Sequence, residues 1–357
     1  MSVTTSASVP PVRMGAAQVG PGRGVYVIAE AGVNHDGSLP KALEMVAAAA
    51  DAGADAVKFQ VFRAAELVTQ DAACAAYQQS ATGAARQRDL LERLELDDAD
   101  FARLRDACAR RGVAFLATPF GVRDVGRLVE LDSAAIKIAS TDSTNFPLLR
   151  AASATGKPLI ASTGAATEAE IEQVVGLLRR GGAGRRLVLL HCVSAYPTPP
   201  EHANLAAIGA LAVKFALPVG FSDHTTLEQT GGWAVAAGAC VLEKHFTLDR
   251  SACGPDHALS LEPAGLKAYI AQARLAAAAL GRGTLGYDAI EADVRASARR
   301  SLVAGRALRA GVVLTEDMIA LKRPAGGIEP ADLERVVGRV LRRELAPDEP
   351  LAWEDLQ

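Results

Sequence analysis

One pattern recurs along most of the chain and constrains its fold more than any other feature of the sequence. A short apolar run rich in β-branched residues ends in polar side chains, and a helical stretch rich in Ala, Leu and Arg follows it. The runs occupy residues 25–30, 55–60, 114–118, 135–140, 158–163, 187–192, 218–222 and 241–247. Apolar strands that alternate with helices are typical of a parallel sheet, and eight of them within about 260 residues predict a (β/α)₈ barrel.

The helices are expected between these runs, at 38–52, 97–111, 145–155, 167–180, 228–238 and 263–280. Ser38 is a suitable N-cap for the first of them, with Pro40 in its first turn. Residues 64–96 separate the second run from the next clear helix, and we expect them to form an excursion at the barrel mouth. A doubly wound sheet is the alternative fold, but no G-x-G-x-x-G sequence follows the first run.

The domain boundaries follow from where this pattern begins and ends. It covers residues 24–282, which we expect to form the barrel, and residues 283–296 are expected to form a polar linker. From 297 to 357 short apolar runs are punctuated by Gly, which predicts a small β-rich domain with a limited core of its own. Residues 1–23 are rich in Ser, Pro, Gly and Val without periodicity, so we expect a flexible leader.

Composition excludes several classes of function. The 38 Lys and Arg residues against 41 Asp and Glu leave a net charge of −3, which lacks the basic excess that nucleic-acid binding requires. No apolar run reaches the roughly 18 residues of a membrane span, and the N-terminus lacks a secretory signal, so a cytoplasmic location is expected. Five cysteines without a C-x-x-C pair indicate neither a disulfide framework nor a thiolate zinc site.

Polar side chains follow every one of the eight expected strands, at the ends where barrel enzymes carry their active sites. In strand order they are Glu30; Lys58 and Gln60; Thr118; Lys137 and Ser140; Ser162 and Thr163; Ser194 and Tyr196; Ser222, Asp223 and His224; and Glu243, Lys244 and His245. Lys58 and Lys137, together with several hydroxyls and the turn at 162–164, predict a phosphate-binding cradle. A salt bridge to a barrel carboxylate is the alternative role for each lysine.

His224 and His245 end neighbouring strands, so we expect their imidazoles to bind one divalent ion. With only two protein nitrogens, and with Glu30 nearby, coordination would stay open for water or substrate, as in a Lewis-acid site. A hydrogen-bonded structural role is the alternative, although it is less favoured for a pair of histidines than for a single one.

Two loops beyond the strands carry further candidates. Asp256 follows Gly254-Pro255 after the eighth strand and is expected either to bind sugar hydroxyls or to be a solvated turn residue. Tyr196 opens the segment Tyr-Pro-Thr-Pro-Pro, whose prolines restrict the backbone. This segment either holds Tyr196 rigidly at the site or only caps the barrel.

Eleven motifs in order resemble those of the sialic acid synthases, the N-acetylneuraminate synthase family. They are IAEAGVNHDGS (28–38), VKFQ (57–60), ATPF (117–120), KIAS (137–140), STG (162–164), HCVSAYPTP (191–199), GFSDHT (220–225), EKHFTLDR (243–250), GPDH (254–257), SLEP (260–263) and KRPAGGIEP (322–330). The resemblance extends from about residue 24 to the C-terminus, as this series of motifs shows. It implies a (β/α)₈ barrel with a C-terminal SAF, or antifreeze-like, domain in a domain-swapped homodimer.

The resemblance also implies a reaction: phosphoenolpyruvate condenses with N-acetylmannosamine to give N-acetylneuraminate and phosphate, with a divalent ion that is usually Mn²⁺. It assigns His224 and His245 to the metal. Lys58, Thr118, Lys137, Ser140, Ser162, Ser194 and Ser222 look like the phosphoenolpyruvate site, and Glu30, Gln60, Tyr196 and Asp256 look like the sugar and catalytic contacts. Glu30, Lys58 and Lys137 are the expected catalytic residues, and Arg323 would meet the N-acyl group from the other protomer.

Two alternatives remain open. The same reaction on a diacetamido-trideoxy hexose would make the chain a legionaminate or pseudaminate synthase, and the motifs do not distinguish the acceptors because one polar substitution changes specificity. A non-catalytic carbohydrate- or ice-binding protein built around the SAF module is less favoured. A binder has no need for a histidine pair and lysines at the strand ends.

Overall fold

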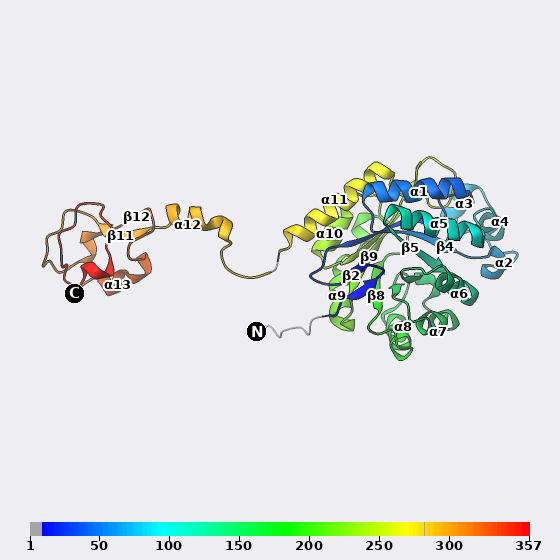
Figure 1. Ribbon diagram of the computed structural model, residues 1–357, viewed down its shortest axis with the longest axis horizontal. Helices are drawn as coiled ribbons and strands as arrows, with labels where there is room; N and C mark the ends of the chain where they lie inside the picture. Colours follow the sequence, from blue (N-terminus) through cyan, green and yellow to red (C-terminus); the bar gives the residue numbers. More distant parts are fainter. Residues whose placement is uncertain (1–8, 282) are drawn as a thin grey trace. The chain divides into compact units, whose positions relative to one another are not determined.

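The computed structural model describes residues 9–281 and 283–357, which form two compact units that divide between residues 282 and 283. In the first unit eight parallel strands close into a barrel in the order β10-β3-β4-β5-β6-β7-β8-β9 (Figure 1). The strands are β3 (Tyr26–Gly32), β4 (Ala56–Val61), β5 (Ala114–Pro119), β6 (Ile136–Ile138), β7 (Leu159–Ser162), β8 (Leu187–Cys192), β9 (Val219–Asp223) and β10 (Val241–His245). The predicted (β/α)₈ barrel is therefore confirmed.

Helices connect the successive strands. They are α1 (Leu39–Ala52), α5 (Asp98–Arg111), α6 (Val122–Glu130), α7 (Phe146–Ala154), α8 (Glu168–Arg180), α9 (Ala206–Phe215), α10 (Thr230–Ala236) and α11 (Pro263–Ala279). Ser38 caps α1 as predicted, because its side chain accepts a hydrogen bond from Lys41 N. Helices α6 and α9 were not among the helices predicted from the sequence.

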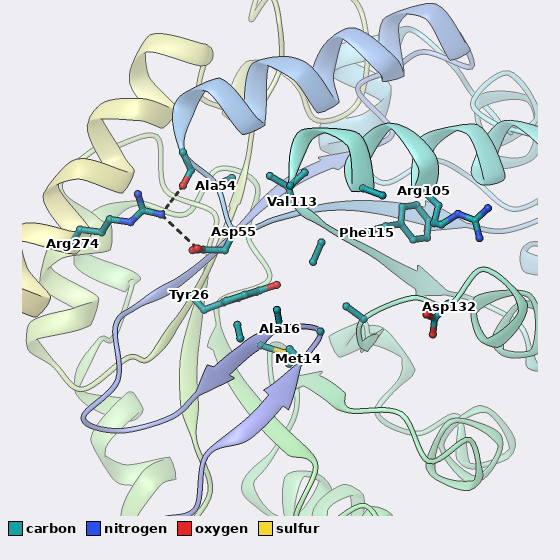
Figure 2. Close-up of a pocket in the computed structure, with 17 residues that line it drawn as sticks. Met14, Ala16, Tyr26, Ala54, Asp55, Arg105, Val113, Phe115, Asp132 and Arg274 are labelled. Carbon is teal, nitrogen blue, oxygen red and sulfur yellow. Dashed lines mark hydrogen bonds and ion pairs between the residues drawn. The ribbon is translucent and has the colours of Figure 1, made fainter.

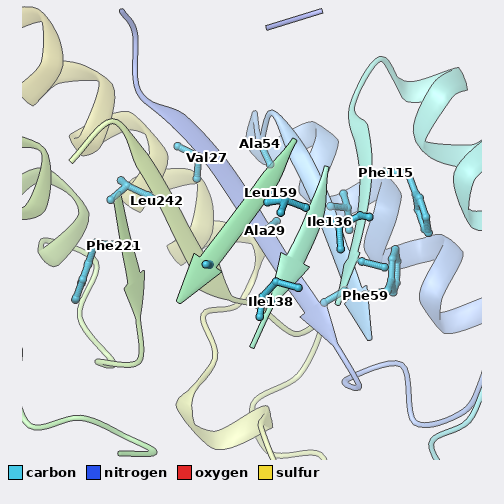
Figure 3. Packing of buried hydrophobic residues seen from close by; sticks show 14 of the residues in the cluster. Val27, Ala29, Ala54, Phe59, Phe115, Ile136, Ile138, Leu159, Phe221 and Leu242 are labelled. Carbon is cyan, nitrogen blue, oxygen red and sulfur yellow. The ribbon is translucent and has the colours of Figure 1, made fainter. Parts of the chain in front are cut away.

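Alternate side chains of the strands pack into two separate apolar cores, one between the strands and the helices and one inside the barrel. Outward-facing residues such as Val27, Phe59 and Phe115 pack against the helices (Figure 3). Inward-facing residues at the amino ends of the strands, including Ile28, Leu116 and Ile160, form a second apolar cluster inside the barrel. The same alternation directs the polar residues at the carboxyl ends of the strands into the barrel mouth.

A β-hairpin lies within the segment that we expected to be a flexible leader, so that prediction is wrong for residues 12–19. Strands β1 (Val12–Met14) and β2 (Ala17–Val19) pair antiparallel, and the side chains of Val12, Met14 and Val19 join the inner apolar cluster. Alternation of apolar and polar residues over so short a stretch is a weak signal, and burial against the barrel supplies the stability that an isolated hairpin lacks. Residues 1–8 of the predicted leader lie outside the described residues.

Two connecting segments contain more structure than the sequence indicated. The excursion after β4 carries the short helices α2 (Ala64–Leu67), α3 (Ala76–Thr82) and α4 (Gln87–Glu92). It lies at the barrel mouth as predicted, since Tyr77 of α3 stacks on Tyr196. The predicted linker includes a 3₁₀ turn and the start of helix α12 (Ala292–Ala298).

The C-terminal unit is small and rich in short strands and turns. Strands β11 (Ser301–Ala304) and β12 (Ile319–Lys322) pair antiparallel, and the unit also contains helix α13 (Leu333–Val336). Its core consists of Leu302, Ala304, Leu308, Leu314, Ile328, Val336, Leu341, Leu345, Leu351 and Leu356. Arg343 forms ion pairs with both Glu349 and Asp355 and so links the segments that carry them.

Among the described residues no helix combines the length and the apolar character that crossing a membrane requires. All five cysteines are free thiols, of which Cys108, Cys192 and Cys240 are buried.

Candidate active site

The inward-facing residues at the carboxyl ends of the strands form one continuous polar surface in the barrel mouth. The mouth is lined by Glu30, Lys58, Gln60, Thr118, Lys137, Ser140, Ser162, Cys192, Tyr196, Ser222, His224, Glu243 and His245, with Phe120 and Ala139. Most of these polar side chains are buried, including both lysines and both carboxylates. Buried charges persist only when they are paired and hydrogen-bonded, so the contacts among these side chains define the site.

Lys58 lies at the centre of one cluster. Its Nζ is 2.6 Å from Glu30 Oε2, donates a hydrogen bond to Thr118 Oγ1 at 3.1 Å, and lies 3.8 Å from Glu243 Oε2. Gln60 donates to the other oxygen of Glu30 at 3.3 Å. Burial would lower the pKa of Lys58, but the two carboxylates outweigh it and raise the pKa, so Lys58 stays a cation.

Glu243 bridges this cluster to the second lysine. Its Oε1 accepts a hydrogen bond from Ser222 Oγ at 2.9 Å and lies 3.7 Å from Lys137 Nζ. Burial raises the pKa of a carboxylate, but Lys137 and Lys58 outweigh that effect and hold the pKa of Glu243 at about 2. Glu243 was predicted only as one of the polar strand-end residues, without a specific role, although the two-residue period of its strand places it on the same face as His245.

Three serine hydroxyls form a cradle beside Lys137. Ser140 Oγ lies 3.3 Å from Ser194 Oγ, and Ser162 Oγ is buried without a hydrogen-bond partner among the described residues. A side chain at Gly164 would not fit, since its β-carbon would lie 2.5 Å from Ser194 Oγ and 3.2 Å from Ser140 Oγ. The glycine in the turn after β7 therefore lets the backbone approach these hydroxyls, as an anion-binding loop requires.

The two histidines meet at the opposite side of the mouth, with ring centres 5.6 Å apart. His224 Nδ1 lies 2.7 Å from Val193 O, which assigns the proton to Nδ1 and leaves the lone pair on Nε2. His245 Nδ1 is buried without a hydrogen-bond partner among the described residues and lies 3.8 Å from Asp256 Oδ2. Burial lowers the pKa of both rings, so both imidazoles are neutral near pH 7.

These features fit a divalent ion with two protein nitrogens and open positions. Within residues 9–281 and 283–357 no group of three or more His, Cys, Asp or Glu side chains is arranged to hold a metal ion. Any ion at His224 and His245 would therefore take its other ligands from water or from a substrate, as in a catalytic rather than a structural site.

Aromatic and acidic side chains surround the histidine pair. The Tyr196 ring lies 4.4 Å from the His224 ring, and the Tyr77 ring stacks on Tyr196 at 5.3 Å. Asp256 is also buried, and burial together with Glu30 raises the pKa of Asp256 to about 7. Asp256 is thus not a solvated turn residue, and Tyr196 does more than cap the barrel. The sequence offered no signal for Tyr77, because the excursion that carries it lacks a strand-end position.

Comparison with known proteins divides the chain near the same point as the two compact units. Residues 45–285 match the NeuB family, and residues 299–357 match the SAF domain. This chain belongs to the NeuB family. The resemblance to the sialic acid synthases and the predictions of a C-terminal SAF domain and of an enzyme are confirmed at the level of the family.

Relatives of this NeuB-family chain include two proteins named N,N'-diacetyllegionaminic acid synthase. The one from Campylobacter jejuni subsp. jejuni serotype O:2 is 40% identical over 325 residues, 90% of this chain and 97% of that protein. The one from Legionella pneumophila is 38% identical over 336 residues, 93% of this chain and 94% of that protein. The crystal structure of N-acetylneuraminic acid synthetase from Leptospira borgpetersenii, in complex with citrate, is 34% identical, has a TM-score of 0.74, and covers 81% of this chain and 96% of its own.

Some strand-end residues do not reach the mouth of this NeuB-family barrel. Asp223 and Lys244 point outward and form an ion pair between the strands and the helices. Arg323 lies in the SAF domain, within the second compact unit, and its contact with a sugar stays a prediction. Thr163 bonds the backbone of β8 through its hydroxyl.

A larger pocket, of about 610 Å³, lies at the amino-terminal end of the barrel beside the hairpin (Figure 2). Its walls are largely apolar, and the Arg274 guanidinium there is directed toward Asp55 at 3.5 Å and donates to Gly53 O. The mouth encloses only about 80 Å³, yet it holds the converging charges. Chemistry rather than volume therefore makes the mouth the candidate active site.

Proposed function

We propose that this enzyme condenses phosphoenolpyruvate with the open-chain aldehyde of an N-acylated amino sugar, and releases a nine-carbon 2-keto acid and phosphate. The observation that carries the proposal is the convergence of two buried lysines, Lys58 and Lys137, on a cradle of serine hydroxyls. Ammonium and hydroxyl donors in a buried site favour a small, highly charged anion, and phosphoenolpyruvate carries both a phosphate and a carboxylate. Membership of a family of synthases supports the same reaction.

The side chains around the cradle divide the anion binding between them. Ser140, Ser162 and Ser194 would donate hydrogen bonds near Gly164, while Lys58, Lys137, Thr118 and Ser222 complete the phosphoenolpyruvate site. The hydroxyl of Ser162, which has no hydrogen-bond partner within residues 9–281 and 283–357, supports this assignment, because a buried hydroxyl without a partner is costly unless a ligand satisfies it. Lys58 and Lys137 would neutralise the phosphate and the carboxylate.

We further propose that His224 and His245 hold a divalent ion, with Mn²⁺ as the first candidate. Three features support two imidazole ligands: the neutral rings, the lone pair on His224 Nε2, which has only a long 3.5 Å contact with Ser222 Oγ, and His245 Nδ1, which has no hydrogen-bond partner among the described residues. When bound, such an ion supplies a Lewis acid that polarises a carbonyl oxygen.

The reaction requires one C–C bond and one C–O cleavage. C3 of phosphoenolpyruvate bonds to the aldehyde carbon, and the aldehyde oxygen takes up a proton to become a hydroxyl. Water then adds to the electron-deficient C2 and loses a proton. The C2–O bond to phosphate then breaks with its electron pair on the phosphate oxygen, and the hydroxyl on C2 becomes the keto group as its proton passes to the released phosphate.

Glu30 is our candidate to orient or deprotonate the attacking water, or to handle the aldehyde proton. Burial, with a contribution from Glu243, raises the pKa of Glu30, and Lys58 offsets only part of this rise. A carboxylate with a raised pKa is a better general base than an ordinary one. The contacts with Lys58 and Gln60 fix the Glu30 carboxylate in position.

The acceptor has two candidates. The resemblance to the sialic acid synthases implies N-acetylmannosamine, whereas the two relatives named N,N'-diacetyllegionaminic acid synthase favour a diacetamido-trideoxy hexose. We propose that Gln60, Tyr196 and Asp256 read the sugar substituents. In a homodimer, which we also propose, Arg323 of the partner subunit would meet the N-acyl group.

One assay tests both the reaction and the acceptor. Purified protein with Mn²⁺ and phosphoenolpyruvate is incubated separately with N-acetylmannosamine and with a diacetamido-trideoxy hexose, and phosphate release is followed alongside the mass of the keto acid. Turnover with the first sugar makes the chain a sialic acid synthase, and turnover with only the second makes it a legionaminate or pseudaminate synthase. No phosphate release with either sugar would contradict the proposed reaction.

A further inference from the structure

A buried ion pair lies on the helix-facing side of strands β9 and β10, against helices α10 and α11. Asp223 and Lys244 are direct neighbours across the two strands, and both side chains are fully buried. Lys244 Nζ lies 3.1 Å from Asp223 Oδ2 and 5.4 Å from the centre of the Tyr269 ring. Tyr269 approaches closely because residue 231 is glycine, where a β-carbon would lie 2.6 Å from the ring. Helices α10 and α11 therefore cover the ion pair and exclude solvent from it.

The same pair binds the backbone of the loop that carries His224. Asp223 Oδ1 accepts a hydrogen bond from Thr225 N at 2.8 Å, and Lys244 Nζ donates to Thr225 O at 2.5 Å. Thr230 donates its hydroxyl to the second oxygen of Asp223. The residues immediately before and after His224 are therefore held by one buried network.

Alternation along the strands connects this network to the barrel mouth. Lys244 faces the helices, so the next residue, His245, faces the barrel interior, and the same holds for Asp223 and His224. His245 Nδ1 has no hydrogen-bond partner among the described residues, so the ring depends on its backbone for its position. His224, in contrast, is also oriented by Val193 O.

We propose that the Asp223–Lys244 pair positions His224 and His245, and that it thereby sets the affinity of the divalent-ion site. The inference rests on the proposed role of these two histidines. Contacts that orient a metal ligand without touching the metal typically change the affinity about 10- to 100-fold when they are removed. A pair with a purely structural role would change the stability of the barrel and leave the affinity for the ion as it was.

The test uses the full chain and measures Mn²⁺ binding directly, by calorimetric titration and by the electron paramagnetic resonance spectrum of bound Mn²⁺. Lys244→Met removes the cation and its bond to Thr225 O. Because this leaves Asp223 buried without a counter-charge and can unfold the protein, a double variant, Asp223→Asn with Lys244→Met, removes both charges. The amide oxygen that replaces the carboxylate keeps an acceptor for Thr225 N.

Asp124→Asn is the matched control. Asp124 is also buried and pairs with Arg127 at 2.9 Å, but it lies on α6 and contacts neither histidine. We expect this variant to lower the melting temperature and to keep the wild-type affinity for Mn²⁺.

We expect the Mn²⁺ dissociation constant of the folded double variant to rise about 10-fold or more, with an altered resonance spectrum. Wild-type affinity and an unchanged spectrum in that variant, with only a lower melting temperature, would overturn the positioning role and leave the proposed function intact. If the wild-type protein itself does not bind Mn²⁺, the metal site fails and this inference fails with it.

Discussion

The interior of the barrel has opposite characters at its two ends, although the same eight strands line both. At the amino end, inward-facing Ile28, Leu116 and Ile160 form an apolar plug that the hairpin closes. At the carboxyl end, Lys58 and Glu243 face the same interior as buried charges. Burial of apolar surface stabilises the first region, whereas the second region is stable only while its charges remain paired. This barrel therefore separates the residues that hold it together from the charged residues to which we assign the proposed reaction.

The largest expected effect concerns the carboxyl end. His224→Ala or His245→Ala should lower metal-dependent turnover about 10³-fold or more, since a Lewis acid contributes several kcal/mol to lowering the barrier. Exhaustive chelation should have the same effect on the wild-type enzyme. Phosphate release and keto-acid mass measure both results, and thermal unfolding should change little.

His191→Gln is the control for this prediction. His191 faces outward from the neighbouring strand β8, where its Nε2 contacts Ala203 O at 2.9 Å. This variant should lose stability and keep its dependence on metal. A chelated wild-type enzyme that retains full turnover would refute the proposed metal site.

The next effect concerns the amino end. Met14→Ala should lower the free energy of unfolding by about 2–5 kcal/mol, since Met14 is buried in the inner cluster and its truncation leaves a cavity. The kcat of the folded variant should stay near the wild-type value. Urea unfolding measures the first quantity, and Gln18→Ala, an exposed position on the same hairpin, is the control. Equal stability of the two variants would show that the hairpin does not close the barrel.

A smaller effect is expected for Tyr77, which stacks on Tyr196 beside the histidine pair. Tyr77→Ala should raise the KM for the acceptor sugar about 2- to 12-fold and leave the KM for phosphoenolpyruvate unchanged, because an aromatic contact of this kind contributes about 0.5–1.5 kcal/mol. Tyr77→Phe keeps the ring and should behave as the wild type. A parallel rise in both KM values would place Tyr77 outside the acceptor pocket.

The sequence predicted the regular parts of this comparison well. The βα pattern located all eight strands, because strands and helices follow from local alternation of apolar and polar residues. The polar strand ends located the mouth, because barrel enzymes carry their active sites at the carboxyl ends of their strands. The structure then brought Glu30, Lys58, Gln60 and Thr118 into direct contact with one another.

What the sequence did not reveal depends on contacts between distant segments. The hairpin at 12–19 gains its stability from the apolar cluster at the amino end of the barrel, and Tyr77 is placed by packing on Tyr196. Glu243 was within reach of sequence reasoning. The two-residue period separates Glu243 and His245, which face inward, from Lys244, which faces the helices. The same period, applied to every strand end, distinguishes the residues that face the mouth from those that face the helices.

The smallest effect compares one buried serine from each region. Ser162 in the mouth has a hydroxyl without a partner among the described residues, whereas Ser133 Oγ donates to Ala135 O at 2.7 Å. Ser133→Ala should therefore lower the free energy of unfolding by about 1 kcal/mol, because it removes a satisfied hydrogen bond, and Ser162→Ala should leave that free energy unchanged or raise it slightly.

The same Ser162→Ala variant should raise the KM for phosphoenolpyruvate several-fold, by loss of a donor to the anion, while Ser133→Ala should not. Urea unfolding and initial-rate kinetics on the two variants measure both quantities. If Ser162→Ala destabilises the protein as much as Ser133→Ala and leaves the KM unchanged, the hydroxyl serves packing rather than substrate. The mouth would then not differ from the amino end of the barrel at that position. The separation between stabilising residues and those assigned to the proposed reaction would not include the three serines.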